Sequence, residues 1–332
     1  MSALIGRREF ITAFGAAVAW PMAASAQQRA MAVIGRAWGT PVVLPAYDQF
    51  WGYVRTGLAE LGYVEDQNYR IESRNAGANY DLMPGLMREL VDQKVTLIIA
   101  SSTLQLEAAK AATQSIPIVF SIGTDPVENG YIASLNKPGG NLTGIYILTG
   151  MLVGKRLEVL HELVPSATKF AFLSDPGNLT FGKVQMRSLQ AVADALGLSL
   201  LNVEAHTSDE FEAAFEASVR AGAGGMVVGS DNFLHGSSKE LAALADRYRL
   251  PAIYPDHSAV KAGGLVSYGA DIIRNGQLVG NYAGRVLRGE KPADMPVQQL
   301  TNMGLTLNLK TAAALGITVP NSLIGRADEV IE

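Results

Sequence analysis

The stretch Thr96-Leu97-Ile98-Ile99-Ala100-Ser101-Ser102-Thr103 carries the pattern that decides the fold. The run 97–100 is apolar at every position, which is typical of a strand in a parallel sheet with helices on both of its faces. Three hydroxyl residues follow at once, and an amphipathic run with helical spacing occupies 104–113. A buried strand, a short polar turn and a helix in this order form one unit of an α/β fold.

The same unit recurs along the chain from residue 31 onward. Short apolar runs alternate with longer amphipathic runs, and the connections between them are short, which predicts two doubly wound α/β lobes. We expect strands at 31–37, 69–73, 96–100, 117–121, 169–174, 199–203, 225–228, 252–254 and 265–268. We expect helices near 46–61, 81–92, 104–113, 151–163, 179–196, 207–220, 236–248 and 271–288.

The N-terminus has the order of an export signal. Arg7 and Arg8 precede a mostly apolar stretch, and Ala24-Ser25-Ala26 follows as a small-x-small cleavage site. Residues 13–20 show no polar face, which argues against an amphipathic helix of the fold. We therefore expect a signal peptide over residues 1–26, of a twin-arginine-like kind. Cleavage after Ala26 would deliver the mature protein to the periplasm.

Composition excludes several classes of function. The chain has no cysteine, which rules out a disulfide framework, a thiolate metal site and a lipid-modified N-terminal cysteine. Its 27 basic and 31 acidic residues give a net charge of −4, which argues against binding to nucleic acid. No Gly-x-Ser-x-Gly, Walker A or G-x-G-x-x-G motif occurs, and the four histidines lack metal-ligand spacing. We expect no catalysis, no metal and no cofactor.

Polar residues cluster where the predicted strands end, and in doubly wound sheets ligands bind beyond those ends. Hydroxyl groups at a helix start suit a carboxylate, and aspartates suit an ammonium group. Trp38, in the loop after the first strand, would supply an aromatic wall. Serine, aspartate and asparagine at such positions also serve as helix caps, so the cap interpretation stays open for each. The candidates are Ser101, Ser102, Thr103, Thr124, Asp125, Asp175, Asn178, Asp231, Asn232 and Tyr268.

Several segments resemble the substrate-binding protein family of ABC transporters, whose better-known members handle tryptophan and other aromatic amino acids. The most specific of them are Thr124-Asp125-Pro126-Val127 and Pro138-Gly139-Gly140-Asn141. The resemblance covers essentially the whole mature chain. The loop 36–41 departs from the family pattern and 232–236 is variable among relatives. Both flank the expected cleft, so they bear on ligand identity.

The resemblance implies a fold of the periplasmic binding protein type I-like kind, with a central cleft and three interlobe crossings. Lobe 1 would comprise 30–146 plus 270–292, and lobe 2 would comprise 147–269 plus 293–332. Carried over by position, the cleft would be lined by Ser101, Ser102, Thr103, Thr124 and Asp125 from one lobe. Asp175, Asn178, Asp231, Asn232 and Tyr268 would come from the other lobe or its edge.

The expected function is to capture a small zwitterion or carboxylate, such as an amino acid or small organic acid, aromatic ones included. The expected partner is an ABC permease in the inner membrane, served by a monomer. Two other classes remain open from sequence. One is an exported enzyme on an α/β scaffold, and the other is a ligand-binding sensory subunit for a membrane receptor.

Overall fold

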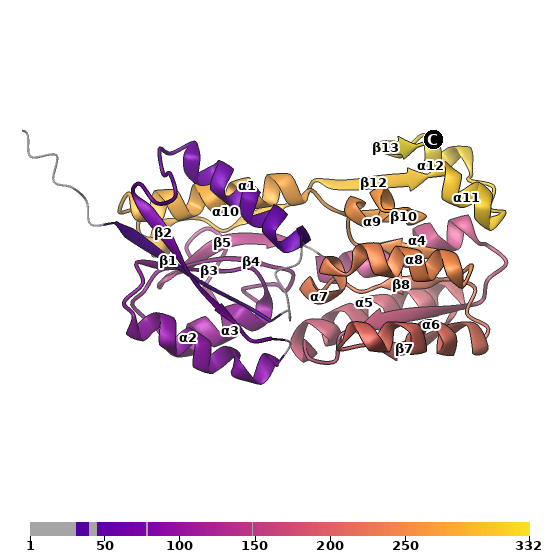
Figure 1. The fold of residues 1–332 in the computed structure, drawn as a ribbon, viewed down its shortest axis with the longest axis horizontal. Coiled ribbons are helices and arrows are strands. Elements are labelled where there is room, and N and C mark those ends of the chain that lie inside the picture. The colour runs from indigo at the N-terminus through magenta and orange to yellow at the C-terminus, as the bar shows by residue number, and fades with distance from the viewer. Residues whose placement is uncertain (1–30, 40–44, 78, 148) are drawn as a thin grey trace, which may run out of the picture.

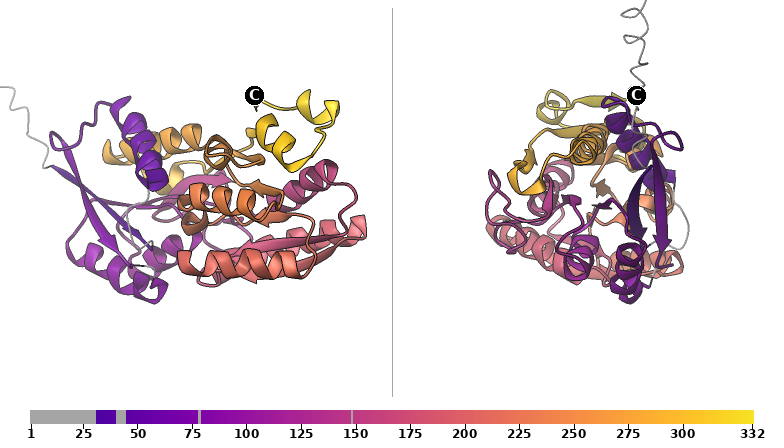
Figure 2. Two further views of the ribbon diagram at one scale, coloured as in Figure 1. Left: turned by 45° about the vertical axis from the view of Figure 1, so that its right-hand side comes forward. Right: turned by 90° about the vertical axis from the view of Figure 1, so that its left-hand side faces the viewer.

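The computed structural model describes residues 31–39, 45–77, 79–147 and 149–332 (Figure 1). Two lobes lie side by side along the long axis, each built on one twisted sheet. The views in Figure 2 show helices on the outer surfaces of both lobes. The predicted signal peptide, residues 1–26, and its cleavage site lie outside the described residues. None of the helices within these ranges is long and apolar enough to cross a membrane.

The first sheet has six described strands in the order β11-β5-β4-β3-β1-β2, all paired in parallel. Side chains alternate along β3: Leu97 and Ile99 pack under α1 and α10, whereas Ile98 packs under α2 and α3. This two-sided burial confirms what the apolar run 97–100 predicted. The strands are β1 (Ala32–Trp38), β2 (Tyr69–Asn75), β3 (Leu97–Ala100), β4 (Ile118–Ile122), β5 (Leu142–Ile147) and β11 (Gln298–Leu300). The helices are α1 (Pro45–Ala59), α2 (Met83–Asp92), α3 (Thr103–Ala112) and α10 (Ile272–Leu287).

The second sheet has seven described strands in the order β13-β12-β10-β9-β8-β6-β7. Its pairs are parallel except for β12, which runs antiparallel to β10. The strands are β6 (Lys169–Ser174), β7 (Ser199–Glu204), β8 (Met226–Val228), β9 (Ala252–Tyr254), β10 (Val266–Ala270), β12 (Met303–Asn308) and β13 (Glu329–Ile331).

Helices cover both faces of this sheet as well. The first face packs against α4 (Thr149–Leu163), α5 (Leu179–Leu196), α11 (Leu309–Leu315) and α12 (Asn321–Ile324). The second packs against α6 (Phe211–Arg220), α7 (Asn232–Gly236), α8 (Ser238–Arg247) and α9 (His257–Lys261). Short 3-10 turns are η1 (Tyr80–Leu82), η2 (Ser208–Glu210) and η3 (Pro292–Asp294).

The chain crosses between the lobes three times, as predicted. It leaves the first sheet after β5, returns from β10 into α10, and leaves again after β11 for β12. The strand pairings move one predicted boundary, because β11 pairs with β5 of the first sheet. Residues 298–300 therefore go with lobe 1, whereas the sequence placed 293–332 in lobe 2. The remaining lobe boundaries stay a proposal.

Four strands were not predicted: β5, β11, β12 and β13. In β5 the cause is Gly144, which follows a Pro-Gly-Gly turn and gives the segment the composition of a loop. Its φ of 152° and the close approach of the Phe120 backbone exclude a side chain there. The glycine therefore marks tight packing of β5 against β4 rather than the absence of a strand.

Candidate functional site

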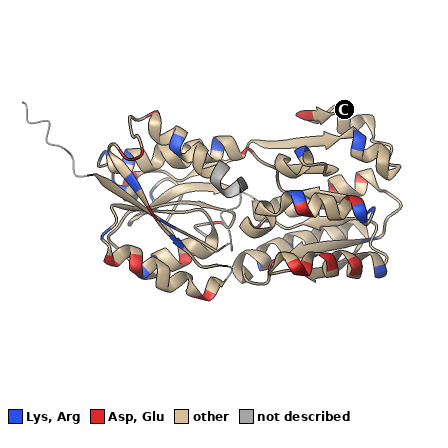
Figure 3. Ribbon diagram, in the orientation of Figure 1, with Lys and Arg blue, Asp and Glu red and all other residues tan. Residues whose placement is uncertain are grey.

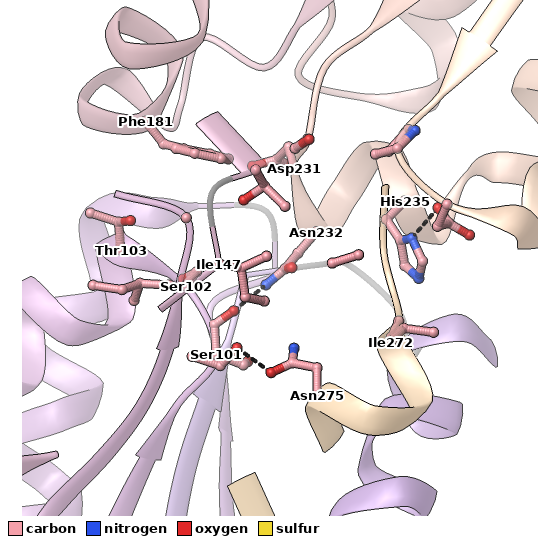
Figure 4. Close-up of a pocket in the computed structure, with 18 of the residues that line it drawn as sticks. Ser101, Ser102, Thr103, Ile147, Phe181, Asp231, Asn232, His235, Ile272 and Asn275 are labelled. Carbon is pink, nitrogen blue, oxygen red and sulfur yellow. Dashed lines mark hydrogen bonds and ion pairs between the residues drawn. The ribbon is translucent and has the colours of Figure 1, made fainter. Parts of the chain in front are cut away.

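A cavity of about 170 Å³ lies between the lobes and takes its lining from both (Figure 4). Such a volume is smaller than the roughly 300–1,000 Å³ of sites for drug-sized ligands, so it suits a small solute. The first lobe and the crossings contribute Phe50, Ser101, Ser102, Thr103, Ser121, Ile122, Gly123, Ile147, Thr149, Ala270, Ile272 and Asn275. The second lobe contributes Asn178, Phe181, Ser230, Asp231, Asn232, His235, Pro255 and Asp256.

The first-lobe wall is built around the start of α3, directly after β3. Ser102 is the N-cap, and its Oγ accepts from the Gln105 amide at 3.3 Å. The Ser101 amide and hydroxyl both donate to Gln105 Oε1, at 2.7 and 3.2 Å. Thr103 is fully enclosed and its hydroxyl shares a 3.1 Å hydrogen bond with the Thr124 hydroxyl. This wall offers hydroxyls and helix-start amides, which suit a carboxylate.

The second-lobe wall is built around Asp231, the N-cap of α7. Its Oδ1 accepts from the Phe233 amide at 2.7 Å, and its Oδ2 accepts from Asn178 Nδ2 at 3.0 Å. Burial raises the pKa of Asp231 to about 6, and the charge of nearby Asp175 acts in the same direction. Burial makes the ionised form of this carboxyl group costly, and an ammonium group placed beside it would stabilise that form.

A second ionisable pair lines the same wall. His235 Nδ1 lies 2.6 Å from Asp256 Oδ2, and Asp256 also caps α9 through the Ser258 amide at 2.8 Å. Burial opposes the charged form of both groups. The pairing outweighs it, so the pKa of His235 is raised and the pKa of Asp256 is lowered to about 2. The pairing therefore favours the imidazolium form of His235 and the carboxylate form of Asp256.

Arg156 stands behind the second-lobe wall and is fully buried. Its Nε donates to the Tyr268 carbonyl at 2.7 Å, and its Nη1 donates to Ser230 Oγ at 2.8 Å. Burial lowers the pKa of Arg156 to about 10, and the charge of Asp256 acts in the opposite direction. The guanidinium thus ties the cavity residue Ser230 to β10, next to the second crossing.

The two walls also touch each other directly. Asn232 Nδ2 of α7 lies 3.5 Å from the Ser101 carbonyl of the first lobe. Gly123, after β4, faces the Phe181 ring of α5 so closely that a Cβ there would lie 2.7 Å from the ring. Tyr80 reaches across to Asp175 and Asp231, and the two carboxylates together with burial raise its pKa. The lobes are therefore closed against each other around the cavity.

Six of the predicted site residues come together at this cavity: Ser101, Ser102, Thr103, Asn178, Asp231 and Asn232. Thr124 lies directly behind them, buried and bonded to Thr103. Trp38 lies in a small hollow beside the cavity with Tyr80. Trp38 is the last residue of β1 rather than part of the loop that follows, and it does not line the cavity. Its ring centroid lies 5.0 Å from the Arg36 guanidinium.

Besides Thr124 and Trp38, three further predicted residues do not line the cavity. Asp125 is turned into its own loop, where Oδ1 accepts from the Val127 and Glu128 amides at 2.8 and 3.0 Å. Asp175 Oδ1 accepts from the Gly177 amide and meets His206 Nδ1, both at 2.8 Å. Tyr268 takes part through its backbone carbonyl, which Arg156 holds. The cap interpretation fits the contacts of Asp125 and Asp175.

His235 and several other residues that line the cavity were not predicted from the sequence. Phe50, Phe181 and Asn275 lie inside helices, where they have the spacing of core residues. Asp256 follows β9 as Asp231 follows β8, and the two strands are neighbours. That adjacency was the available signal, because parallel strand ends meet at one edge of a sheet. No group of three or more metal-ligating side chains occurs in the part of the chain that the structure describes.

The chain resembles known proteins along most of its length. Residues 39–331 match the family model described as ABC transporter substrate binding protein. A tyrosine-binding protein from Clostridioides difficile (strain R20291) is 30% identical over 264 residues, which are 80% of this chain and 75% of that protein.

The arrangement of the two lobes can be compared with that in two solved structures. A structure from Streptococcus pneumonia, an ABC domain in complex with L-Trp, is 26% identical, with 90% of this chain and 99% of that chain covered and a TM-score of 0.79. The ligand-free, open structure of a substrate-binding protein with adhesive properties from Clostridium difficile has the same identity and coverage but a TM-score of 0.60. The lobes of this chain are arranged more like those of the L-Trp complex.

Proposed function

The chain belongs to the ABC transporter substrate-binding protein family, and from this premise we propose that it captures a free α-amino acid and delivers it to an ABC permease. Its doubly wound lobes and three crossings are those of the type I periplasmic binding proteins. The proposal places capture in the cavity between the lobes, without catalysis, and places the protein in the periplasm. Ligands of the relatives, tyrosine and L-Trp, support an amino acid with an aromatic side chain.

One observation carries the proposal: the start of α3, with the Ser102 hydroxyl, faces the partly buried carboxylate of Asp231 across the cavity. The α-carboxylate of the ligand is assigned to the start of α3, at the Ser102 hydroxyl and the helix-start amides, because such groups favour an anion. The α-ammonium is assigned to Asp231, because burial and the charge of Asp175 raise the pKa of this carboxyl and a cation beside it would stabilise its ionised form. A zwitterion satisfies both walls, whereas a simple anion or cation satisfies one.

Asn178 and Asn232 complete the proposed ammonium site. Asn178 donates to Asp231 Oδ2 and so orients the carboxylate. Asn232 contacts the Ser101 carbonyl, so it joins the walls when the lobes close. Closure about the three crossings is the proposed response to ligand, in line with hinge motion in binding proteins of two lobes.

The test is a thermal-shift screen of ligand-free mature protein against the twenty amino acids, followed by calorimetry of any binder. A ligand at 100 times its Kd should stabilise the protein by about 2.7 kcal/mol. For a chain of this size that is a rise in Tm of roughly 5–10 °C, at about 2–4 °C per kcal/mol. Each binder is incubated with the protein and re-measured intact, because chemical turnover would identify an enzyme instead. A screen in which no amino acid raises Tm would sink the proposal.

A further inference from the structure

The side chain of His235 lines the cavity, and the proposed sites for the α-amino and α-carboxyl groups of a ligand do not include it. Asp231 caps α7 and His235 lies one turn further on, with its amide bonded to the Asp231 carbonyl at 2.8 Å. Figure 4 shows the Ser101–Thr103 segment and His235 on opposite sides of the view, with Asp231 above and Asn232 between them, so these groups border the cavity from different sides. With the carboxylate site at one end and the ammonium site in the middle, His235 faces the remaining part of the ligand.

Asp256 determines which ring nitrogen of His235 carries the proton that points toward it. Ionised Asp256 only accepts hydrogen bonds, so His235 Nδ1 carries the proton that points to Asp256 Oδ2. The Ser258 amide and hydroxyl hold Asp256 in place, and only 7% of its surface is exposed. Figure 4 shows the other ring nitrogen, Nε2, on the side of the ring that points away from Asp256, and His235 lines the cavity. Its hydrogen-bonding capacity is therefore available to a ligand.

Several apolar residues line the cavity together with His235. Phe50 comes from α1, which packs against α7, and Ile272 comes from the start of α10. Pro255 precedes Asp256, and Ala270 ends β10 at the second crossing. These residues can contact an apolar group of the ligand. The Nε2 atom of His235 favours one polar atom on that group.

We propose that His235 is the specificity-determining residue of the cavity and selects an amino acid whose aromatic ring carries a hydroxyl group over one with an unsubstituted ring. The inference rests on the proposed function. A phenolic hydroxyl both donates and accepts, so it satisfies Nε2 whether the imidazole is neutral or charged. An indole N–H donates only and satisfies the neutral ring alone. A phenyl ring leaves Nε2 without a partner in a closed cavity, which costs affinity.

The experiment is calorimetric titration of L-tyrosine, L-tryptophan and L-phenylalanine into four proteins at one pH. They are the wild type, His235→Phe, His235→Gln and, as a matched control, His161→Phe. His161 lies in α4, away from the cavity, with its ring edge against Phe170. The wild type and the control should bind tyrosine about 10- to 100-fold more tightly than phenylalanine, with tryptophan between them. His235→Phe should weaken tyrosine and bring the ratio near one, and His235→Gln should keep part of it.

The outcomes separate the two proposals. Equal affinity of the wild type for tyrosine and phenylalanine overturns the inference and leaves the proposed function standing. An equal loss for all three ligands in His235→Phe does the same, because His235 would then hold a group that they share. If none of the three ligands binds the wild type, the inference fails, whereas the proposed function fails only if the screen of all twenty amino acids finds no binder either. The wild-type ratio tests the inference even if His235→Phe does not fold.

Discussion

The two walls of the cavity use different chemistry. The first-lobe wall contains hydroxyls, amides and apolar side chains, without an ionisable group among its described lining residues, whereas the second-lobe wall contains Asp231, His235 and Asp256. Charged residues of both signs elsewhere lie spread over the outer helices of both lobes (Figure 3). The difference implies a division of labour. The neutral wall positions one end of the ligand, and the ionisable wall sets the charge and polarity that the ligand must have.

The largest expected effect comes from removing the charge of the second-lobe wall. Asp231→Asn keeps the shape and one oxygen for the cap, but it leaves the ligand ammonium without a counter-charge. We expect amino-acid affinity to fall by about 2–5 kcal/mol, the usual loss when one member of a buried charge pair is removed. Calorimetry measures the loss.

Asp125→Asn is the matched control for that change. Asp125 follows a strand of the first lobe and accepts two backbone amides, as Asp231 does for its helix, but it does not line the cavity. Its loss should cost stability of about 1 kcal/mol and leave affinity unchanged. Equal affinity losses in both variants would contradict the division between the walls.

The next effect comes from holding the walls apart. Gly123→Ala places a Cβ against Thr149 Oγ1 and 2.7 Å from the Phe181 ring of the other lobe, so both side chains must move for the lobes to close. Overpacking of this kind costs about 1–3 kcal/mol, and the contact with Phe181 places part of that cost on the closed form. We expect weaker ligand binding and a smaller effect on the Tm of the ligand-free protein. Small-angle scattering should show a smaller contraction on ligand addition; a wild-type contraction with wild-type affinity would refute this.

The affinity for an amino acid should also depend on pH, because burial raises the pKa of Asp231 to about 6. The ammonium binds the ionised form, so affinity falls as pH drops through 6, by at most about tenfold per pH unit, and is level above pH 7. Asp175, Tyr80 and His235 face Asp231 and interact with it electrostatically. Calorimetry between pH 5 and 8 tests this, and Asp231→Asn should remove most of the dependence. An affinity that rises toward pH 5 would be the wrong sign.

The smallest effect is expected at the neutral wall. Ser102→Ala removes the N-cap hydroxyl of α3 and one donor for the ligand carboxylate, while the helix-start amides remain. Stability and affinity should each fall by about 1 kcal/mol. Chemical denaturation and calorimetry measure the two losses. If Ser102→Ala weakened binding more than Asp231→Asn, the neutral wall would be the dominant one.

The sequence predicted the fold well because local patterns decide it. The apolar run 97–100 and its repeats identify the parallel strands, and the positions of the helices follow from their periodicity. The site was predicted in part, for a physical reason. Asp125 and Asp231 follow strands in the same way and both accept backbone amides, so sequence cannot separate them. Only the packing of the lobes places Asp231 at the cavity and turns Asp125 into its loop.

The His235–Asp256 pair illustrates the rest of the gap. Its members are 21 residues apart and meet because β8 and β9 are neighbours in the sheet. Phe50 and Asn275 reach the cavity because α1 and α10 pack together over the first sheet. Such meetings depend on strand order and helix placement, which single-sequence periodicity does not determine.

The order of the strands along the chain has a consequence for incomplete polypeptides. Every described residue that lines the cavity precedes residue 276, yet β11, β12 and β13 come after residue 297 and lie at one edge of each sheet. A chain cut near residue 290 would contain all of the described side chains that line the cavity, but both of its sheets would lack strands at one edge. Premature termination or proteolysis of the C-terminal segment should therefore leave fragments that cannot sequester solute, so that only finished molecules compete for it.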